Sequence, residues 1–184
     1  IGIVDTSPGE CLGIPVVGGD ADLPSLRMQG YEHAFITVGS IGNTALRRRL
    51  AARVEELGFQ IPNIIDPSAL TSPFAVLGKG VFIGKNAVVN ARCAVGDYAI
   101  LNTGCILEHD CSIGAFAHIS PGAVLCGNVT VGADAHIGAN AAVLQGITIG
   151  TGALVGAGSV VTRIVEAGAV AYGNPCRKVR QTCV

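Results

Sequence analysis

The stretch "VVNARCAVGDYAILNTGCILEHDCSIGAFAHIS", residues 88–120, repeats a six-residue pattern that decides the fold. An aliphatic residue recurs at every sixth position from Leu77 to Val161 without a slip. The pattern extends back to Ile65, with Thr71 as its one weak member. Glycine often follows the aliphatic residue, and a small residue usually stands four positions after it. This hexapeptide period is the signature of a parallel β-helix, in which three six-residue sides make one coil.

The period predicts one continuous prism over residues 65–165, with successive coils stacked about 4.8 Å apart. Cys93, Cys105 and Cys111 fall on the small position inside the prism, where we expect them to be buried and to pack as small hydrophobic groups. The chain has seven cysteines and no C-x-x-C pair, so the pattern indicates neither a disulfide framework nor a zinc knuckle.

Residues 1–64 have a different pattern, which is typical of an α/β domain. "IGIVD" (1–5) and "AFITV" (34–38) read as short buried strands of a small parallel sheet. Residues 43–57 read as a helix with Asn43 or Thr44 as its N-cap and Gly58 as its stop. Its expected apolar stripe is made of Leu46, Leu50, Val54 and Leu57. The sequence therefore predicts two domains, 1–64 and 65–184.

Composition excludes several functions. Twelve Lys and Arg against thirteen Asp and Glu provide no electrostatic case for nucleic acid or an anionic membrane. The cluster of Arg47, Arg48, Arg49 and Arg53 reads as the solvated face of a helix. No apolar run is long enough to span a bilayer, and no signal region is visible, so we expect a cytoplasmic protein.

Histidines and carboxylates gather in the middle of the prism. His118 and His136 both precede an aliphatic position and are eighteen residues apart, so they should stack outward on one face of adjacent coils. His109 lies half a coil before His118, which places it on a different side of the prism. It stands in "EHD" (108–110), where a neighbouring carboxylate orients an imidazole and stabilises its protonated form, as a general base requires.

Two other interpretations of these histidines have to be weighed. His136 and His33 are typical of ordinary surface histidines. Three histidines also match the ligand inventory of a catalytic zinc ion, but spacings of nine and eighteen residues put only two of them on one face. We therefore expect no metal site.

The prism and its histidine block resemble the bacterial sugar acyltransferases with hexapeptide repeats, which include UDP-4-amino-sugar N-acetyltransferases and sialic-acid O-acetyltransferase-like proteins. The resemblance rests on residues 88–132, on "GAGSVVTR" (156–163) and on "AYGNPCRKVR" (171–180). It implies a left-handed β-helix and transfer of an acetyl group from acetyl-CoA to an amino or hydroxyl group of a nucleotide-activated sugar, such as a UDP-sugar.

The resemblance also implies roles for particular residues. His109 matches the general base, Asp110 the acidic residue that raises its basicity, and Asn102 a polar residue near the reacting centre. His118 matches the histidine that contacts the acetyl end of acetyl-CoA, and the cofactor's pantetheine arm would lie along Gly127, Ala139 and Ala157. Arg177, Lys178 and Arg180 either meet the CoA phosphates or form a frayed tail.

At the N-terminus the chain departs from the family pattern. It opens on Ile1 without the family's first strand and histidine-bearing turn, so we expect an incomplete nucleotide-sugar domain. Asp5 matches the first residue of a two-acid site, and Thr6 stands in place of the second. Gly39, Gly42 and Asn43 of "VGSIGN" (38–43) are the expected nucleotide contacts.

Assembly follows from the shape and charge of the prism. Few ionic residues occur between Ala99 and Thr162, and such faces favour burial against a partner. We predict a homotrimer whose sites are shared between chains, with His109 of one chain near His118 of the next. The alternatives are an acetyltransferase for another small amine or alcohol, a metal-dependent β-helix hydratase, and a non-catalytic scaffold.

Overall fold

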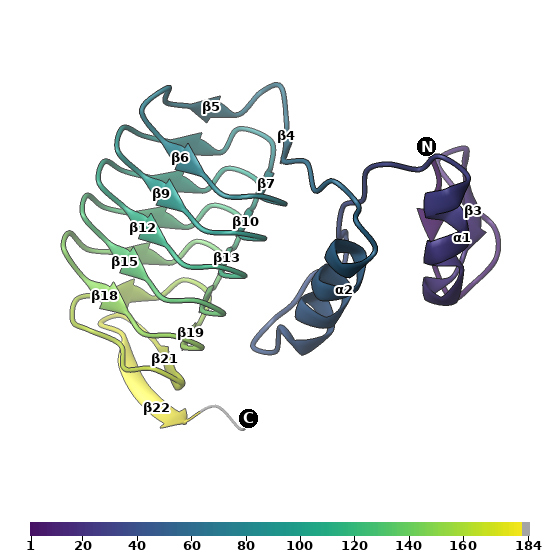
Figure 1. Cartoon of the computed structure of the whole chain (residues 1–184). Helices are drawn as coiled ribbons and strands as arrows, with labels where there is room; N and C mark the ends of the chain where they lie inside the picture. The colour runs from purple at the N-terminus through teal and green to yellow at the C-terminus, as the bar shows by residue number, and fades with distance from the viewer. Residues whose placement is uncertain (182–184) are drawn as a thin grey trace.

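The computed structural model describes residues 1–181, which form a tall prism and a smaller N-terminal part beside it (Figure 1). Helix α2 lies between the prism and the N-terminal sheet. None of the helices among these residues is long and apolar enough to cross a membrane.

The prism is a left-handed parallel β-helix with three sheets of two-residue strands. The eight-stranded sheet also takes in β21 and β22 at its C-terminal end. Its order is β22-β21-β19-β16-β13-β10-β7-β4, and its hexapeptide strands are β4 (Ile64–Ile65), β7 (Phe82–Ile83), β10 (Ile100–Leu101), β13 (His118–Ile119), β16 (His136–Ile137) and β19 (Leu154–Val155). The six-stranded sheet contains β5 (Leu70–Thr71), β8 (Val88–Val89), β11 (Ile106–Leu107), β14 (Val124–Leu125), β17 (Ala142–Val143) and β20 (Val160–Val161). The five-stranded sheet contains β6 (Val76–Leu77), β9 (Ala94–Val95), β12 (Ser112–Ile113), β15 (Thr130–Val131) and β18 (Thr148–Ile149).

The predicted register is confirmed along the prism. From β4 to β17, each strand pairs in parallel with the strand eighteen residues further on, as in Leu101 with Ile119. The aliphatic residue at each strand end points inward, and from Ile83 to Val161 these residues are almost fully buried. Glycine after the aliphatic residue is a packing requirement: a Cβ on Gly138 would lie 2.5 Å from the backbone nitrogen of Ala157 in the next coil.

Cys93, Cys105 and Cys111 are buried, as predicted, but two of them do more than fill space. The Cys93 thiol donates to the carbonyl oxygen of Glu108 at 3.0 Å, and the Cys111 thiol donates to that of Cys126 at 3.3 Å. Burial raises the pKa of Cys105 to about 12. The thiols of Cys93 and Cys111 therefore satisfy backbone carbonyls at one corner of the prism.

The N-terminal part contains a three-stranded sheet of order β1-β3-β2, with β1 (Ile3–Val4), β2 (Glu10–Cys11) and β3 (Ile14–Gly18). β1 pairs with β3 in parallel and β2 pairs with β3 antiparallel, so the sheet is mixed. A short 3-10 helix (Asp20–Asp22) and α1 (Leu23–Met28) follow.

The strand predicted over residues 34–38 is wrong. This segment is extended and partly buried but forms no strand, because among residues 1–181 the one pairing beside it is the bridge between His33 and Gln60. The Ala34 N–H donates to the Gln60 carbonyl at 3.0 Å, and no neighbouring strand continues the ladder. An apolar extended run without a partner strand cannot become sheet.

Helix α2 (Ala45–Glu56) is confirmed, but its buried face differs from the predicted one. Arg47, Ala51 and Val54 are buried, whereas Leu46 is 43% exposed. The prediction of a fully solvated arginine cluster is therefore wrong for Arg47, which is 2% exposed. Its Nη2 donates to the carbonyl oxygen of Tyr98 at 2.8 Å, and its guanidinium lies over the ring of Phe116.

The described part of the C-terminal segment forms two strands. β21 (Ala169–Tyr172) extends the eight-stranded sheet, and β22 (Arg177–Gln181) pairs with it antiparallel. Arg177, Lys178 and Arg180 thus belong to an edge strand rather than to a frayed tail.

Candidate active site

His109 lies on the corner between the six-stranded and five-stranded sheets, directly after β11. Its Nδ1 lies 2.7 Å from Oδ2 of Asp110. Because a carboxylate only accepts, Nδ1 carries the hydrogen and the lone pair of the neutral ring is on Nε2. Half of the side chain is exposed, and within residues 1–181 no hydrogen bond reaches Nε2. The ring is thus arranged as a base with a free acceptor nitrogen.

Asp110 is held from its other side by Arg92, one coil earlier. Nε of Arg92 lies 2.5 Å from Oδ1, and Nη2 lies 2.8 Å from Oδ2. Hydrogen bonds from Arg92 and then from His109 hold the pKa of Asp110 well below its usual range. Asp110 has a φ of 62°, a left-handed conformation that Asp tolerates at such turns. Asp110 is therefore ionised and fixed beside the imidazole.

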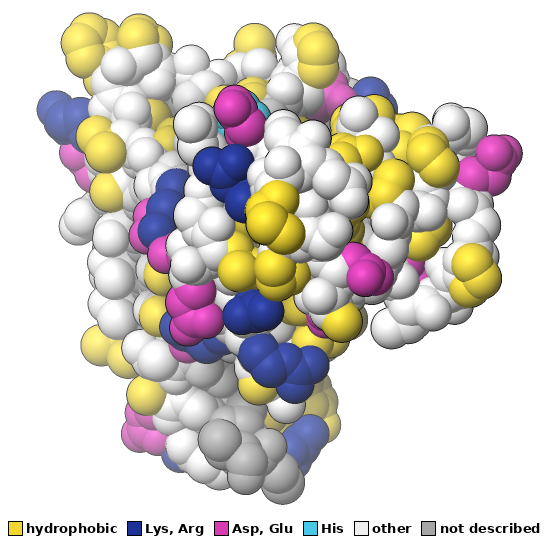
Figure 2. Space-filling model, turned by 45° about the vertical axis from the view of Figure 1, so that its right-hand side comes forward, with side chains coloured by type: hydrophobic (Ala, Val, Ile, Leu, Met, Phe, Trp, Pro, Cys, Tyr) yellow, Lys and Arg dark blue, Asp and Glu magenta, His cyan; other side chains and the backbone are white. Residues whose placement is uncertain are grey.

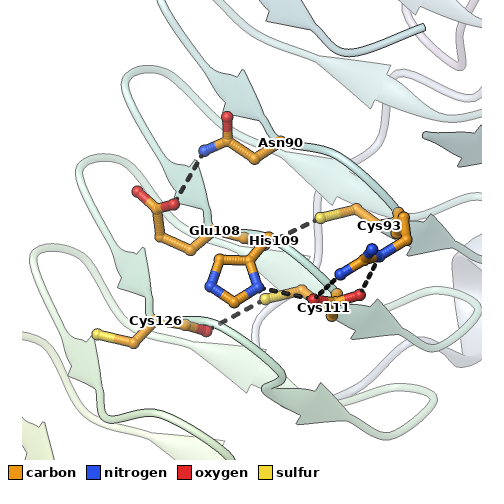
Figure 3. A network of polar contacts seen from close by, with 8 residues as sticks. Asn90, Cys93, Glu108, His109, Cys111 and Cys126 are labelled. Carbon is orange, nitrogen blue, oxygen red and sulfur yellow. Dashed lines mark hydrogen bonds and ion pairs between the residues drawn. The ribbon is translucent and has the colours of Figure 1, made fainter. Parts of the chain in front are cut away.

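Glu108, the other acid of "EHD", does not contact His109. Its Oε2 accepts from Nδ2 of Asn90 at 3.2 Å, and Figure 3 shows its carboxylate directed toward Asn90. The two acids that flank the histidine in sequence thus have different partners, and only Asp110 can orient the ring.

His118 lies on the eight-stranded sheet and has both ring nitrogens occupied. Nδ1 is 3.2 Å from the carbonyl oxygen of Ser40, and Nε2 is 3.2 Å from Nδ2 of Asn102. The carbonyl requires a hydrogen on Nδ1, so Nε2 accepts from the amide. Burial lowers the pKa of His118, with a further contribution from the positive charge of Arg47. His118 is therefore held as a neutral imidazole.

His136 stacks one coil beyond His118, as the register predicts, and their ring centroids are 4.9 Å apart in an edge-to-face arrangement. The expectation of a surface histidine is wrong, because only 7% of His136 is exposed. Its Nε2 lies 3.2 Å from Oγ of Ser120. Its buried Nδ1 finds no partner among residues 1–181. Burial, and then the neighbouring His118, lower the pKa of His136 to about 4.

Helix α2 is fastened to the corner between the five-stranded and eight-stranded sheets. Arg48 forms a two-bond ion pair with Asp134, at 2.8 and 2.7 Å, and Thr44 donates to the same carboxylate at 2.5 Å. Tyr98 donates to Glu55. Figure 2 shows acidic and basic side chains gathered along this boundary. The attachment places the segment 38–43 against the prism.

Segment 38–43 meets the prism at His118 but not at His109. Besides the Ser40 contact, a Cβ on Gly42 would lie 3.3 Å from Cδ1 of Leu154. Gly39 is exposed, and Oδ1 of Asn43 accepts from the N–H of Ala45 at the start of α2. The structure therefore brings the predicted nucleotide segment beside His118 and Asn102.

Asp5 is not brought to this place. It follows β1 in the N-terminal part, where its N–H donates to the carbonyl oxygen of Gly18 at 3.0 Å. Its Oδ1 accepts from the N–H of Ser7 at 2.9 Å. Asp5 lines a shallow hollow together with Ile3, Ser7, Pro8, Gly9, Glu10, Cys11 and Val16.

Ala139 and Ala157 occupy equivalent positions on the corner between the eight-stranded and six-stranded sheets. They stack one coil apart, and within residues 1–181 their backbone N–H groups make no hydrogen bond. Asn102 belongs to the same corner, two coils earlier. A corner with small side chains and free N–H donors suits an extended chain that carries amide carbonyls. Gly127 instead lies beneath the ring of His109, on the other corner.

Sequence reasoning missed Arg92, Ser40 and Arg47. Arg92 could have been found from the register, because it lies eighteen residues before Asp110 and therefore directly beside it. No local signal marks the Ser40 carbonyl or the burial of Arg47. Among residues 1–181, no group of three or more His, Cys, Asp or Glu is placed to hold a metal ion.

The chain is similar to known transferases along nearly its whole length. The model of the bacterial transferase hexapeptide matches residues 110–145, and that of the hexapeptide repeat of succinyl-transferase matches residues 128–163. A mutant of perosamine N-acetyltransferase from Caulobacter crescentus, solved with CoA and GDP-perosamine, is 41% identical. The match covers 98% of this chain and 85% of that one, with a TM-score of 0.92.

Two further structures support the same relationship. The acetyltransferase domain of PglB from Neisseria gonorrhoeae, in complex with acetyl coenzyme A, is 38% identical over 96% of this chain and 84% of that one, with a TM-score of 0.88. WeeI from Acinetobacter baumannii is 28% identical over 97% and 85%, with a TM-score of 0.86. With this similarity the chain belongs to the hexapeptide-repeat family of bacterial sugar acyltransferases and is an acetyltransferase that uses acetyl-CoA as its co-substrate.

Proposed function

We propose that this enzyme transfers the acetyl group of acetyl-CoA directly to the amino group of a nucleotide-linked amino sugar, with His109 as general base. The observation that carries the proposal is the imidazole whose Nδ1–H is held by Asp110 while Nε2 stays free on an exposed corner. An amino acceptor is favoured because two of the similar structures contain GDP-perosamine and CoA.

In the reaction the acceptor nitrogen attacks the thioester carbon and a new C–N bond forms. Nε2 of His109 takes the proton that the nitrogen loses. The C–S bond then breaks, and the proton passes from Nε2 to the departing thiolate to give CoASH. Asp110 keeps the ring in the required tautomer and stabilises the imidazolium that forms between these steps.

The acetyl end of acetyl-CoA meets His118 in this proposal. The developing oxyanion needs a hydrogen-bond donor, and the only N–H of the neutral His118 ring is at Nδ1, which now donates to the Ser40 carbonyl. The thioester oxygen therefore takes the place of the Ser40 carbonyl. Asn102 holds Nε2 and keeps the hydrogen on Nδ1.

The pantetheine arm runs along Ala139 and Ala157, whose free N–H groups donate to its amide carbonyls, and reaches the site past Gly127. The sugar nucleotide contacts segment 38–43, through Gly39, Gly42 and Asn43. Asp5 belongs to the acceptor domain rather than to the reacting centre.

We further propose that the enzyme is a homotrimer whose six-stranded sheets face the threefold axis. The outward residues of that sheet are all aliphatic: Leu70, Val88, Ile106, Val124, Ala142 and Val160. The five-stranded sheet instead presents Ser112, Thr130 and Thr148, and segment 38–43 covers part of the eight-stranded sheet.

This orientation makes the active site common to two chains. The six-stranded sheet has the His109 corner at one edge and the Ala139 corner at the other. A threefold axis facing this sheet places the His109 corner of one chain beside the Ala139 corner and His118 of the next. Within one chain these groups lie on different sides of the prism, so the trimer unites them.

The experiment is an incubation of the protein with acetyl-CoA and a panel of nucleotide-linked sugars that carry either a free amino group or only hydroxyl groups. We expect CoASH release with amino sugars and its loss by about 10² to 10⁴ in His109→Ala. CoASH release with the hydroxyl sugars alone would show that the acceptor is a hydroxyl group rather than an amino group. Full activity of His109→Ala would show that His109 is not the general base.

A further inference from the structure

The cation beside Asp110 has no role in the mechanism described so far. Arg92 lies eighteen residues before Asp110 and meets it across two adjacent coils, with two parallel N–H to oxygen contacts of 2.5 and 2.8 Å. The second of these reaches Oδ2, the oxygen that also accepts from His109. Arg92, Asp110 and His109 therefore form a chain of contacts that ends at the free Nε2.

We propose that Arg92 is a positioning residue that sets both the orientation and the protonation range of the base. The planar guanidinium fixes both carboxylate oxygens, so Oδ2 cannot turn away from the imidazole. A carboxylate with only His109 as partner would be held at one oxygen alone and could turn more easily about its χ2 bond. This inference rests on the proposed function.

Charge provides the second part of the effect. The charged groups around His109 are Asp110 and Arg92, together with Glu108, which is turned toward Asn90. The next coil contributes Gly127 and Asn128 to this corner, neither of which is charged. Asp110 alone would favour the imidazolium, which is useless as a base, whereas the cation of Arg92 offsets that preference.

Stability of the fold does not explain the pair. The side chain of Arg92 is 74% exposed, and ion pairs in such settings contribute little to folding. The place of the pair on the corner that bears the base is better explained by the reaction.

The test compares Arg92→Met, Arg92→Lys and Lys85→Met. Lys85 pairs with Asp66 at 2.9 Å on an early coil and a different corner, so it is a matched loss of an exposed cation. We expect Arg92→Met to lower kcat by about tenfold to a hundredfold near neutral pH, a cost typical of a misplaced catalytic group, with KM for acetyl-CoA unchanged. Arg92→Lys should restore part of the rate, and Lys85→Met should match the wild type.

The pH profile separates positioning from a structural effect. Without the cation, the protonated ring is favoured, so the acidic limb of the kcat profile should move to higher pH in Arg92→Met. Protonation of the His109 ring, followed by NMR without substrate, should extend to higher pH in the same variant. The NMR result does not depend on the acceptor or on turnover, so a failure of the proposed function is distinguishable from a failure of this inference.

A double-mutant cycle completes the test. In the Asp110→Asn background, Arg92→Met should lower kcat little further, because Arg92 acts through the carboxylate that this background lacks. An unchanged acidic limb, or a full additional loss in the Asp110→Asn background, would overturn the inference.

Discussion

The ring of His109 covers the α-carbon of Gly127 in the next coil: a Cβ on Gly127 would lie 2.6 Å from both Cε1 and Nε2 of the imidazole. The backbone of Gly127 thus supports the ring of His109. The carbonyl of His109 also accepts from the N–H of Asn128 at 2.8 Å, which fixes the two adjacent coils relative to each other at this corner.

Gly127→Ala should therefore displace the base and leave the fold intact. The added methyl meets the end of a side chain that can rotate, so we expect a change in Tm of only a few degrees but a fall in kcat of about tenfold or more. Gly96→Ala is the contrasting control, because its Cβ would lie 2.7 Å from the backbone nitrogen of Ala115. Thermal unfolding and turnover, measured on both variants, check the prediction. An active Gly127→Ala enzyme would show that His109 does not need its present orientation.

Mixing subunits tests the shared site. His109→Ala and His118→Ala proteins should each be inactive or nearly so, and exchange of their subunits should restore part of the activity. Recovery follows because some interfaces in a mixed trimer combine an intact His109 with an intact His118. The measurement is CoASH release before and after exchange, with mass spectrometry of the assembly as control. If mixed trimers form and stay inactive, the site lies within one chain.

Acid should destabilise the prism through His136. Its pKa is lowered to about 4 in the folded protein, from 6.5, so the unfolded chain binds more protons between these values. The free energy of unfolding should therefore decrease as pH falls from about 6.5 to about 4, with an upper bound of about 3 kcal/mol from this group.

His136→Phe removes the titrating ring and should flatten that part of the stability profile, measured by urea unfolding at several pH values. His33→Gln, at an exposed position, is the control and should retain the wild-type slope. An equal slope in His136→Phe and wild type would mean that other groups cause the acid sensitivity.

The Cys93 thiol should matter as a hydrogen-bond donor. Cys93→Ser keeps a donor for the Glu108 carbonyl, whereas Cys93→Ala leaves that part-buried acceptor without one. We expect Cys93→Ala to be less stable than Cys93→Ser by about 1 kcal/mol and to lower kcat, because Glu108 precedes the base. Chemical unfolding and steady-state kinetics of both variants provide the measurement. Equal stability and equal kcat of the two variants would show that Cys93 acts only as a small packing residue.

The hexapeptide period was sufficient to predict the prism, because each aliphatic residue makes the same contacts one coil away. The same register placed Cys93 inside and stacked His118 on His136. It also implies the pairing of Arg92 with Asp110, because these two residues are eighteen positions apart and therefore lie side by side in adjacent coils. These relationships are repeats of one local geometry, so they can be read from spacing alone.

The tertiary structure decided what lies against the prism. Leu46 is exposed and Arg47 buried because the docking of α2 against Tyr98 and Phe116, rather than helix amphipathicity, selects the buried face. The carbonyl of Ser40 reaches His118 across 78 residues of chain, and residues 34–38 form no strand because no partner strand is beside them. The sequence by itself determined the period and therefore the prism, whereas the contacts of its histidines with distant segments depend on how two unlike surfaces fit, which no period encodes.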